Sequence, residues 1–244
     1  MKALIFAAGL GTRMKSLTEH KPKALVEIAG KTLLEWNILK LKNCGFDRIV
    51  INIHHFADQI IEFLDSKNNF GVDISLSIEK EQPLETGGGV KYVLEQGLLD
   101  EAFLIHNVDI ISDIDLVSFY KSHSDSSLAT LLVSRRETER YLLFDDNMRL
   151  CGWTNVKSGE VRSPYGEINP RKYHKYAFSG IHVFNPVLGS SILDMGDKFS
   201  IIDYYLSVAG TMQIKGVCFD EVKIVDVGKP EAISRAEALL RIRS

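Results

Sequence analysis

The chain has 244 residues and a formal net charge of −3 at pH 7, with 45% hydrophobic and 25% charged residues; this length suits one α/β domain with an elaboration and can bury a large core. The charge balance favours neither a nucleic-acid nor a membrane partner, and no apolar run reaches the roughly 18 residues that a membrane span needs. The three cysteines, Cys44, Cys151 and Cys218, lie far apart without metal-ligand spacing, which indicates reduced thiols in a cytoplasmic protein.

Short apolar runs alternate with helical patterns through the first half of the chain. The expected order is strand 3–8, helix 31–45, strand 48–53, helix 56–67, strand 74–79, helix 89–97, strand 102–107, helix 115–123 and strand 128–134. Alternating strands and helices are typical of a mostly parallel sheet with helices on both faces. The sequence therefore predicts a Rossmann-like α/β fold.

The alternation breaks near residue 135. Residues 135–177 are polar, aromatic and rich in turn formers, with a hairpin turn expected at 145–147. We interpret them as a small β-rich insertion over the carboxyl, active-site edge of the sheet. The remaining elements are expected as strand 178–184, helix 199–210, strand 212–219, strand 222–228 and helix 231–243. Because no linker, repeat or low-complexity stretch is present, we expect residues 1–244 to form a single domain.

The loop Gly9-Leu10-Gly11-Thr12-Arg13-Met14 comes just after the first strand. Ligands bind outside the carboxyl ends of strands in open α/β sheets, so this loop is placed for binding. Glycines let backbone N–H groups approach an anion closely, and an arginine fork suits phosphate oxygens. Two familiar patterns fail, because Met14 stands where GxGxxG needs a third glycine and no GK[ST] follows. The loop alone leaves a tight turn and a phosphate site as alternatives.

A lysine further along the chain favours the phosphate site. Pro22 stiffens the chain that carries Lys23, and Arg13 and Lys23 flanking one loop would form a polyphosphate clamp. Taken together, FAAGLGTRM and PKALVEIAGKTLLEW resemble the signature of the sugar nucleotidyltransferases, or NDP-sugar pyrophosphorylases. The resemblance extends through ETGGGV (85–90), FLIHNVDI (103–110), FSGIHVF (178–184) and IVDVGKPEAISRAEALL (224–240). It leaves out residues 135–177, and it implies the nucleotide-diphospho-sugar transferase fold.

The resemblance also implies a reaction, in which an NTP and a sugar 1-phosphate give an NDP-sugar and pyrophosphate. The attacking phosphate oxygen is already ionised at neutral pH, so positioning and charge neutralisation are the expected catalytic contributions. In the family pattern the catalytic cations are Arg13, on the leaving pyrophosphate, and Lys23, on the α-phosphate and sugar phosphate. The implied nucleotide-binding positions are Ala8, Gly9, Gly11, Thr12, Gln82, Thr86 and Gly87, and the implied sugar-binding positions are Glu85, Ser179 and Gly180.

Two aspartates are the expected ligands of a Mg²⁺ cofactor. Asp109 closely follows strand 102–107, and Asp226 lies in a later strand. Mg²⁺ usually takes one or two carboxylates together with phosphate oxygens and waters, and both positions match the family's metal ligands. A single aspartate at a strand end would equally suit a turn or a helix cap. Val108 departs from the family, which usually has glycine there, but it leaves the carboxylate of Asp109 in place.

Residues 81–90 (EQPLETGGGV) are expected to hold the nucleoside, because consecutive glycines let a base and a ribose lie against the backbone. The amide of Gln82 can accept from N3–H and donate to O4 of uracil. Guanine presents two donors, which a carboxylate matches better. Gln82 therefore favours UTP over GTP, with a role in a surface turn as the alternative.

The stretch PLETGGG most resembles the branch of the family that uses UTP and N-acetylmuramic acid 1-phosphate. Mannose- and heptose-1-phosphate guanylyltransferases are the alternative. Their stretch is more often PLGTGG or PLGTAG, so Glu85 discriminates unless it only caps a helix. A hypothesis of another class is a non-catalytic nucleotide-sugar-binding regulatory protein, which would be expected to lose Arg13, Lys23 or an aspartate. The oligomeric state stays open, and sugar specificity is expected within residues 135–180.

Overall fold

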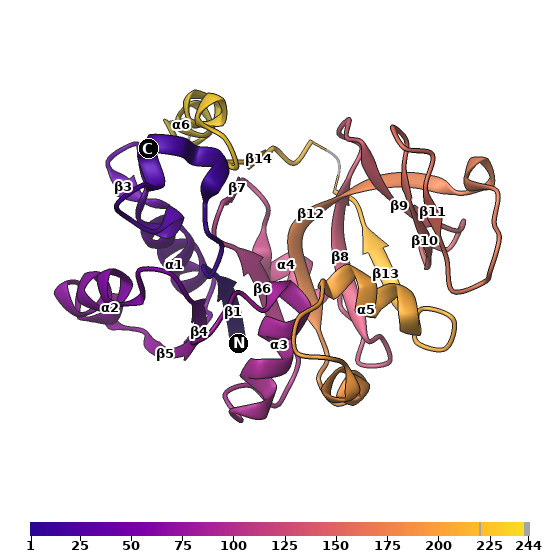
Figure 1. Ribbon diagram of the computed structural model, residues 1–244, viewed down its shortest axis with the longest axis horizontal. Helices are drawn as coiled ribbons and strands as arrows, with labels where there is room; N and C mark the ends of the chain where they lie inside the picture. Colours follow the sequence, from indigo (N-terminus) through magenta and orange to yellow (C-terminus); the bar gives the residue numbers. More distant parts are fainter. Residues whose placement is uncertain (220, 242–244) are drawn as a thin grey trace.

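The computed structural model describes residues 1–219 and 221–241. One large sheet runs through the molecule, with helices on both of its faces (Figure 1). The strand order is β11–β10–β9–β12–β6–β1–β4–β5, and β8 joins β12 and β13 beside this path. The strands of this sheet are β1 (Lys2–Phe6), β4 (Arg48–Ile53), β5 (Asp73–Ile78), β6 (Phe103–Asn107), β8 (Ala129–Ser134), β9 (Arg140–Phe144), β10 (Leu150–Asn155), β11 (Val161–Arg162), β12 (His174–Phe184) and β13 (Ile214–Val217).

The parallel half of the sheet consists of β6, β1, β4 and β5. Leu4 of β1 lies in register with Val50 of β4 on one side and with Ile105 of β6 on the other. All three side chains are fully buried. Strands buried on both faces read as near-continuous apolar runs, which explains why the sequence predicts this half well. Their carboxyl ends meet at one edge of the sheet.

Helices cover both faces of the sheet and divide the core in two. α1, α2, α4 and α6 contribute Ile38, Ile60, Phe119 and other side chains to one hydrophobic cluster, whereas α3 and α5 contribute to the other. The helices are α1 (Leu33–Asn43), α2 (Ala57–Ser66), α3 (Glu85–Glu95), α4 (Leu116–Lys121), α5 (Ile201–Val208) and α6 (Ile233–Arg241). These layers confirm the predicted α/β fold. Within the described ranges, no helix has both the length and the apolar character to cross a bilayer.

Residues 135–177 extend the large sheet. β9 pairs with the first part of β12, β10 pairs with β9, and β11 pairs with β10, and all three pairings are antiparallel. The expected hairpin turn is present, with the Asp145 carboxylate accepting from the backbone N–H groups of Asn147 and Arg149. Arg162 stacks on Trp153 and lies 2.5 Å from the carboxylate of Asp203 in α5. These contacts hold the insertion against the helical layer.

Two short strand pairs lie outside the large sheet. β14 (Ile224–Asp226) pairs antiparallel with β7 (Ile110–Ser112), and β2 (Glu27–Ile28) pairs with β3 (Lys31–Thr32). The short 3₁₀ helices are η1 (Thr12–Thr18), η2 (Lys23–Leu25), η3 (Asn68–Gly71), η4 (Pro170–Lys172), η5 (Ser190–Asp194) and η6 (Pro230–Ala232). The helix expected over 231–243 spans Ile233–Arg241, and residues 242 and 243 lie outside the described ranges.

One helix begins earlier than the sequence predicts. The apolar periodicity suggests a start at residue 89, but α3 starts at Glu85. Its first turns contain the glycine run, which carries no side-chain periodicity. The backbone N–H groups of Gly87 and Gly88 donate to the carbonyl oxygen of Phe199. A side chain at Gly88 would collide with the backbone at Asp197, so these glycines permit close packing of α3 on the segment before α5.

Candidate active site

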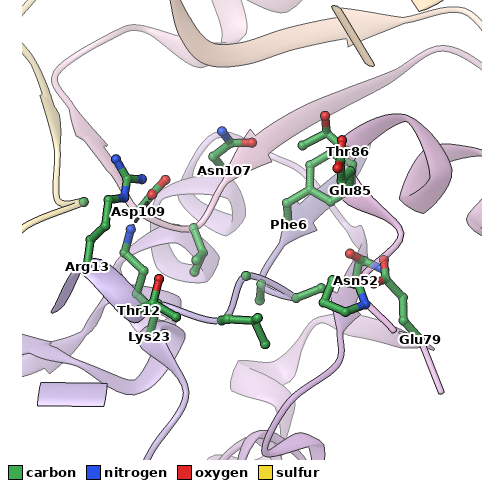
Figure 2. Close-up of a pocket in the computed structure, with 18 of the residues that line it drawn as sticks. Phe6, Thr12, Arg13, Lys23, Asn52, Glu79, Glu85, Thr86, Asn107 and Asp109 are labelled. Atoms are coloured by element: carbon green, nitrogen blue, oxygen red, sulfur yellow. Dashed lines mark hydrogen bonds and ion pairs between the residues drawn. The ribbon is translucent and has the colours of Figure 1, made fainter. Parts of the chain in front are cut away.

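A cavity of about 490 Å³ opens at the carboxyl ends of the parallel strands. Figure 2 shows Arg13, Lys23 and Asp109 on one side of this main cavity and Asn52 and Glu79 on the other. The lining comes from the loop after β1 and from residues at or just beyond the ends of β4, β5 and β6. The sheet topology therefore brings together side chains that are far apart in the sequence.

The loop after β1 forms one wall of the main cavity. Its lining residues include the predicted positions Ala8, Gly9, Gly11, Thr12 and Arg13. Gly11 has φ +66°, and a Cβ there would lie 3.1 Å from side-chain carbons of Lys23 and Thr18, so the turn itself requires glycine. A Cβ at Gly9 would meet open space. Gly9 therefore leaves room for a ligand beside the backbone.

Lys23 and Asp109 form an ion pair at the wall of the main cavity. The Lys23 ammonium donates to Asp109 Oδ2 across 2.5 Å. The side chains are 8% and 21% exposed, so the pair is well shielded from solvent. Lys23 is the first residue of η2, and Pro22 before it is the extended N-cap of this short helix. An ammonium group has three donors, and pairing with one carboxylate oxygen leaves donors for a ligand.

The backbone around Asp109 is fixed by two partners. The Asn37 amide donates to the carbonyl oxygen of Val108, and the Val227 N–H donates to the carbonyl oxygen of Asp109. Val108 is 5% exposed and packs in the core. Val108, where the family usually has glycine, is therefore almost fully buried although it also lines the main cavity, and the Asp109 carboxylate lies at the cavity beside Lys23 (Figure 2).

Asp226 in β14 pairs with Ile110 of β7, the residue that follows Asp109. Its backbone therefore lies close to the Lys23–Asp109 wall of the main cavity. Asp226 does not line the main cavity; it lines an adjoining side hollow that shares Arg13 and Gly228 with it. Among the described residues, no three His, Cys, Asp or Glu side chains gather into a complete metal site. The two predicted metal ligands therefore come from adjoining backbone, while Asp109 lines the main cavity and Asp226 the side hollow; that they hold Mg²⁺ stays a prediction.

Arg13 stands between the two hollows, and it is exposed. A Cβ at Gly228 would lie 2.8 Å from Asp226 Oδ1 and 3.4 Å from Arg13 Nη2. Because Gly228 has no side chain, the side chains of Asp226 and Arg13 can both lie close to its backbone. The guanidinium makes no hydrogen bond or ion pair to any residue that the structure describes, so its donors are available to a ligand.

Sequence analysis missed a buried carboxylate on the opposite side of the main cavity. Glu79 is 3% exposed; its carboxylate accepts from the Asn52 amide and from the backbone N–H of Leu84, each at 2.9 Å. Burial raises the pKa of Glu79, and these two hydrogen bonds oppose the shift. Glu79 thereby ties down the loop that leads into α3. Its signal in the sequence is a charged residue at the end of a buried strand.

Glu85 and Thr86 also line the main cavity, at the start of α3. Glu85 adopts φ +62°, a left-handed conformation that favours glycine. The Thr86 hydroxyl accepts from the backbone N–H of Ile201. Gly87 lies one residue further on and is covered by Phe199. Protein atoms therefore occupy the space in which a side chain at Gly87 would lie, and Gly87 does not line the main cavity. That residues 81–90 hold the nucleoside stays a prediction, and Glu85 and Thr86 are among those at the cavity.

Three further predicted positions, besides Asp226 and Gly87, lie away from the main cavity. Gln82 is exposed and lines a neighbouring hollow with Leu84 and Lys91. Ser179 is 2% exposed, and its hydroxyl has no hydrogen-bond partner. Gly180 has φ +71°, and a Cβ there would approach the amide of Asn107 to 2.9 Å. Ser179 and Gly180 lie behind the cavity wall that Asn107 forms.

Comparison with known proteins supplies independent information. Residues 2–241 match the family model described as nucleotidyl transferase. The N-acetylmuramate α-1-phosphate uridylyltransferase of Neisseria meningitidis serogroup B is 41% identical over 124 residues, which cover 51% of this chain and 53% of that relative. The Caulobacter vibrioides protein of the same name is 32% identical over 251 residues, covering 98% of this chain and 96% of that relative.

Other relatives carry different substrate names. The D-glycero-α-D-manno-heptose 1-phosphate guanylyltransferase of Campylobacter jejuni is 29% identical over 234 residues, covering 95% of this chain and 96% of that relative. A crystal structure of UDP-glucose pyrophosphorylase complexed with UDP-glucose superposes with a TM-score of 0.79, at 16% identity, and the match covers 100% of this chain and 99% of that chain. This last likeness concerns the fold.

Proposed function

Because the chain belongs to the nucleotidyl transferase family, as a sugar nucleotidyltransferase, we propose that it transfers UMP from UTP to N-acetylmuramic acid 1-phosphate. The observation that carries the proposal is the ion pair of Lys23 with Asp109 in the same cavity as Arg13, which has no partner in 1–219 or 221–241 and lies in the loop after β1. Full-length similarity to a relative with this activity supports the choice of substrates. Because the relatives' names involve a nucleotide and a sugar phosphate, we place the reaction in the cytoplasm, where nucleoside triphosphates are made.

The reaction needs charge neutralisation more than proton transfer. An oxygen of the sugar phosphate forms a bond to the α-phosphorus, and the bond from that phosphorus to the bridging oxygen breaks. The electron pair stays on the departing pyrophosphate. Among the described residues, no histidine lines the main cavity, which agrees with a nucleophile that is already ionised. Cations placed before the reaction starts then stabilise the charge that develops.

Each charged residue has a distinct part in this proposal. Lys23 is held by Asp109 with donors to spare, so it can contact the α-phosphate and the sugar phosphate together. Arg13 faces the outgoing phosphates with a planar fork of donors. Asp109 and Asp226 would hold a Mg²⁺ ion, whose bound charge would neutralise phosphate oxygens. Removing a preorganised donor commonly lowers turnover roughly 100- to 1,000-fold.

The choice of an acidic sugar has support from Lys198. This exposed lysine lines the main cavity, and within the described ranges it makes no ion pair. Its neighbour Phe199 packs on Gly87, which places Lys198 near the start of α3. Figure 2 shows Glu85 and Thr86, at this helix start, on the side of the main cavity opposite Arg13. N-acetylmuramic acid carries a carboxylate that neutral sugars lack. Lys198 can supply the counter-charge for it.

A guanylyltransferase acting on a heptose or mannose 1-phosphate is the second candidate. The similarity to the Campylobacter jejuni relative over nearly the full length of both chains favours it. The placement of Gln82 outside the main cavity also weakens the argument from the uracil edge. Glu85 remains the local feature that separates the two candidates, because it faces the main cavity from a backbone conformation that glycine would adopt more readily.

The decisive experiment is a matrix of UTP, GTP, dTTP and CTP against several sugar 1-phosphates. Pyrophosphate release and the mass of the nucleotide sugar are measured, with and without Mg²⁺. We expect the highest kcat/KM for UTP with N-acetylmuramic acid 1-phosphate. A preference for GTP with a heptose or mannose 1-phosphate would replace the proposal by the second candidate. Binding of nucleotide sugars without turnover of any pair would indicate a regulatory protein.

A further inference from the structure

The side hollow is a separate feature that joins the main cavity at Arg13. It has a volume of about 250 Å³. Lys229 and Arg235 line it from the segment after β14 and from the first turn of α6, together with Asp226 and Glu231. Arg13 and Gly228 line both hollows. A ligand in the main cavity can therefore extend past Arg13 into the side hollow.

Three cations face the side hollow without partners. Arg13, Lys229 and Arg235 are exposed, and none makes a hydrogen bond or ion pair to any residue in 1–219 or 221–241. Surface cations elsewhere in this protein do find carboxylates, as Lys157 does with Glu139. Unpaired cations around one small hollow favour a multiply charged anion.

The position of Arg235 strengthens this reading of the side hollow. It lies in the first turn of α6, where the partial positive charge of the helix end makes a cation unfavourable. The nearest carboxylate before this turn along the chain is that of Glu231 in η6, which runs directly into α6. A bound anion would relieve this unfavourable charge and would also meet the N-terminal end of the helix.

We propose that the side hollow binds the β- and γ-phosphates of the NTP and receives them as pyrophosphate, with Lys229 and Arg235 as ligands. The inference rests on the proposed function, because it divides one nucleotide between the two hollows. The α-phosphate lies with Lys23 in the main cavity, and Arg13 spans the bond that breaks. When the α–β bridging bond breaks, its electron pair goes to pyrophosphate, and the cations of the side hollow meet the new charge.

The test measures both directions of the reaction. In the Lys229→Gln, Arg235→Gln double variant, we expect the KM for pyrophosphate in the reverse reaction to rise by about fivefold for each cation removed. The KM for the nucleotide sugar in the same assay should stay within about twofold, because the nucleotide sugar carries no leaving pyrophosphate. Arg235→Lys should recover most of the affinity. A general folding defect would change both constants together.

Two matched variants control for charge and for position. Glu231→Gln removes a negative charge from the side hollow, so it should lower the KM for pyrophosphate. Arg241→Gln removes the same residue type from the other end of α6, outside the side hollow, and should change neither constant. Binding of inorganic pyrophosphate by calorimetry, without turnover, repeats the comparison. Affinity should fall in the double variant and rise in Glu231→Gln.

The outcomes separate this inference from the proposed function. If the wild-type protein turns over nucleotide sugars and the double variant keeps its KM for pyrophosphate, the side hollow is not the pyrophosphate site. If no nucleotide and sugar pair is turned over, the proposed function fails, and calorimetry alone decides the inference. Loss of pyrophosphate binding in the double variant would then still support an anion site, and unchanged binding would overturn it.

Discussion

The ion pair between Lys23 and Asp109 predicts different stabilities for its two single variants. Lys23 is 8% exposed at its side chain, whereas Asp109 is 21% exposed. Asp109→Asn leaves an ammonium almost fully buried beside a neutral amide, and Lys23→Met leaves a carboxylate that water can reach. Breaking a buried pair by removing one partner costs up to about 3–5 kcal/mol. Partial exposure reduces this, so we expect about 2–3 kcal/mol for Asp109→Asn and about 1 kcal/mol for Lys23→Met.

The double variant decides whether the pair itself carries the effect. In Lys23→Met with Asp109→Asn, neither position carries a charge, so neither substitution leaves the other's partner charged and unpaired. We expect it to be more stable than Asp109→Asn alone, with a coupling energy of about 1–2 kcal/mol. Urea denaturation followed by circular dichroism gives the free energies of unfolding. Purely additive single effects would show that the 2.5 Å contact contributes nothing to stability.

Turnover of the same variants separates folding from catalysis. Lys23→Met should lower kcat roughly 100- to 1,000-fold while leaving most of the protein folded, because Lys23 contacts the phosphates in our proposal. Activity is measured by pyrophosphate release at a temperature where more than nine-tenths of the variant is folded. This condition requires a free energy of unfolding above about 1.3 kcal/mol. If activity only follows the folded fraction, Lys23 is structural and the assignment of the phosphate site is incorrect.

Four further predictions concern other residues. Arg13→Ala should lower kcat roughly 100- to 1,000-fold with an unchanged melting temperature, because Arg13 is exposed and has no partner among the described residues. UTP should exceed GTP in kcat/KM by roughly 5- to 150-fold. Because Gln82 lies outside the main cavity, Gln82→Glu tests its role: a narrowed ratio assigns base reading to Gln82, and an unchanged ratio assigns it elsewhere. Lys198→Gln should lower kcat/KM about fivefold for N-acetylmuramic acid 1-phosphate and spare N-acetylglucosamine 1-phosphate. Burial lowers the pKa of His182 from 6.5 to about 3. The unfolded chain therefore binds more protons between these values, and stability falls as pH drops below about 6.5; His182→Phe should flatten that slope in urea denaturation at pH 5 and 7.

The sequence predicts the residues that follow directly from strand order. Arg13 and Asp109 come just after β1 and β6, and parallel strands end at one edge, so their meeting in the main cavity follows from topology. Asn52 and Glu79 follow from the same topology, since Asn52 is the last residue but one of β4 and Glu79 directly follows β5. They escape notice because a polar residue at a strand end also suits a turn. Only the structure shows that their side chains bond to each other.

The orientation of side chains is harder to predict than their place in the chain. Ser179 and Gly180 lie within β12, where neighbouring residues face opposite sides of the sheet. The position of a local irregularity in pairing between Phe178 and His182 decides which side each faces. Its one sign in the sequence is Gly180, since a glycine within a strand pattern often marks a bulge. The same applies to Gln82, because a loop of a few residues can direct adjacent side chains into two different hollows, as Pro83 and Gln82 show.

The glycine run gives the most instructive difference. Three successive glycines suggest a flexible loop, because each lowers helix stability by about 1 kcal/mol relative to alanine. Here they form the first turns of α3, since the backbone at Asp197 and the ring of Phe199 fill the space that side chains would need. The packing of α3 on this segment thus outweighs the low helix propensity of glycine, and the helix begins at Glu85. Glu85 then accepts a left-handed backbone at the rim of the main cavity. A strained residue that points a charge at a binding site is held there by the packing behind it, so the buried glycines and the exposed carboxylate are parts of one arrangement.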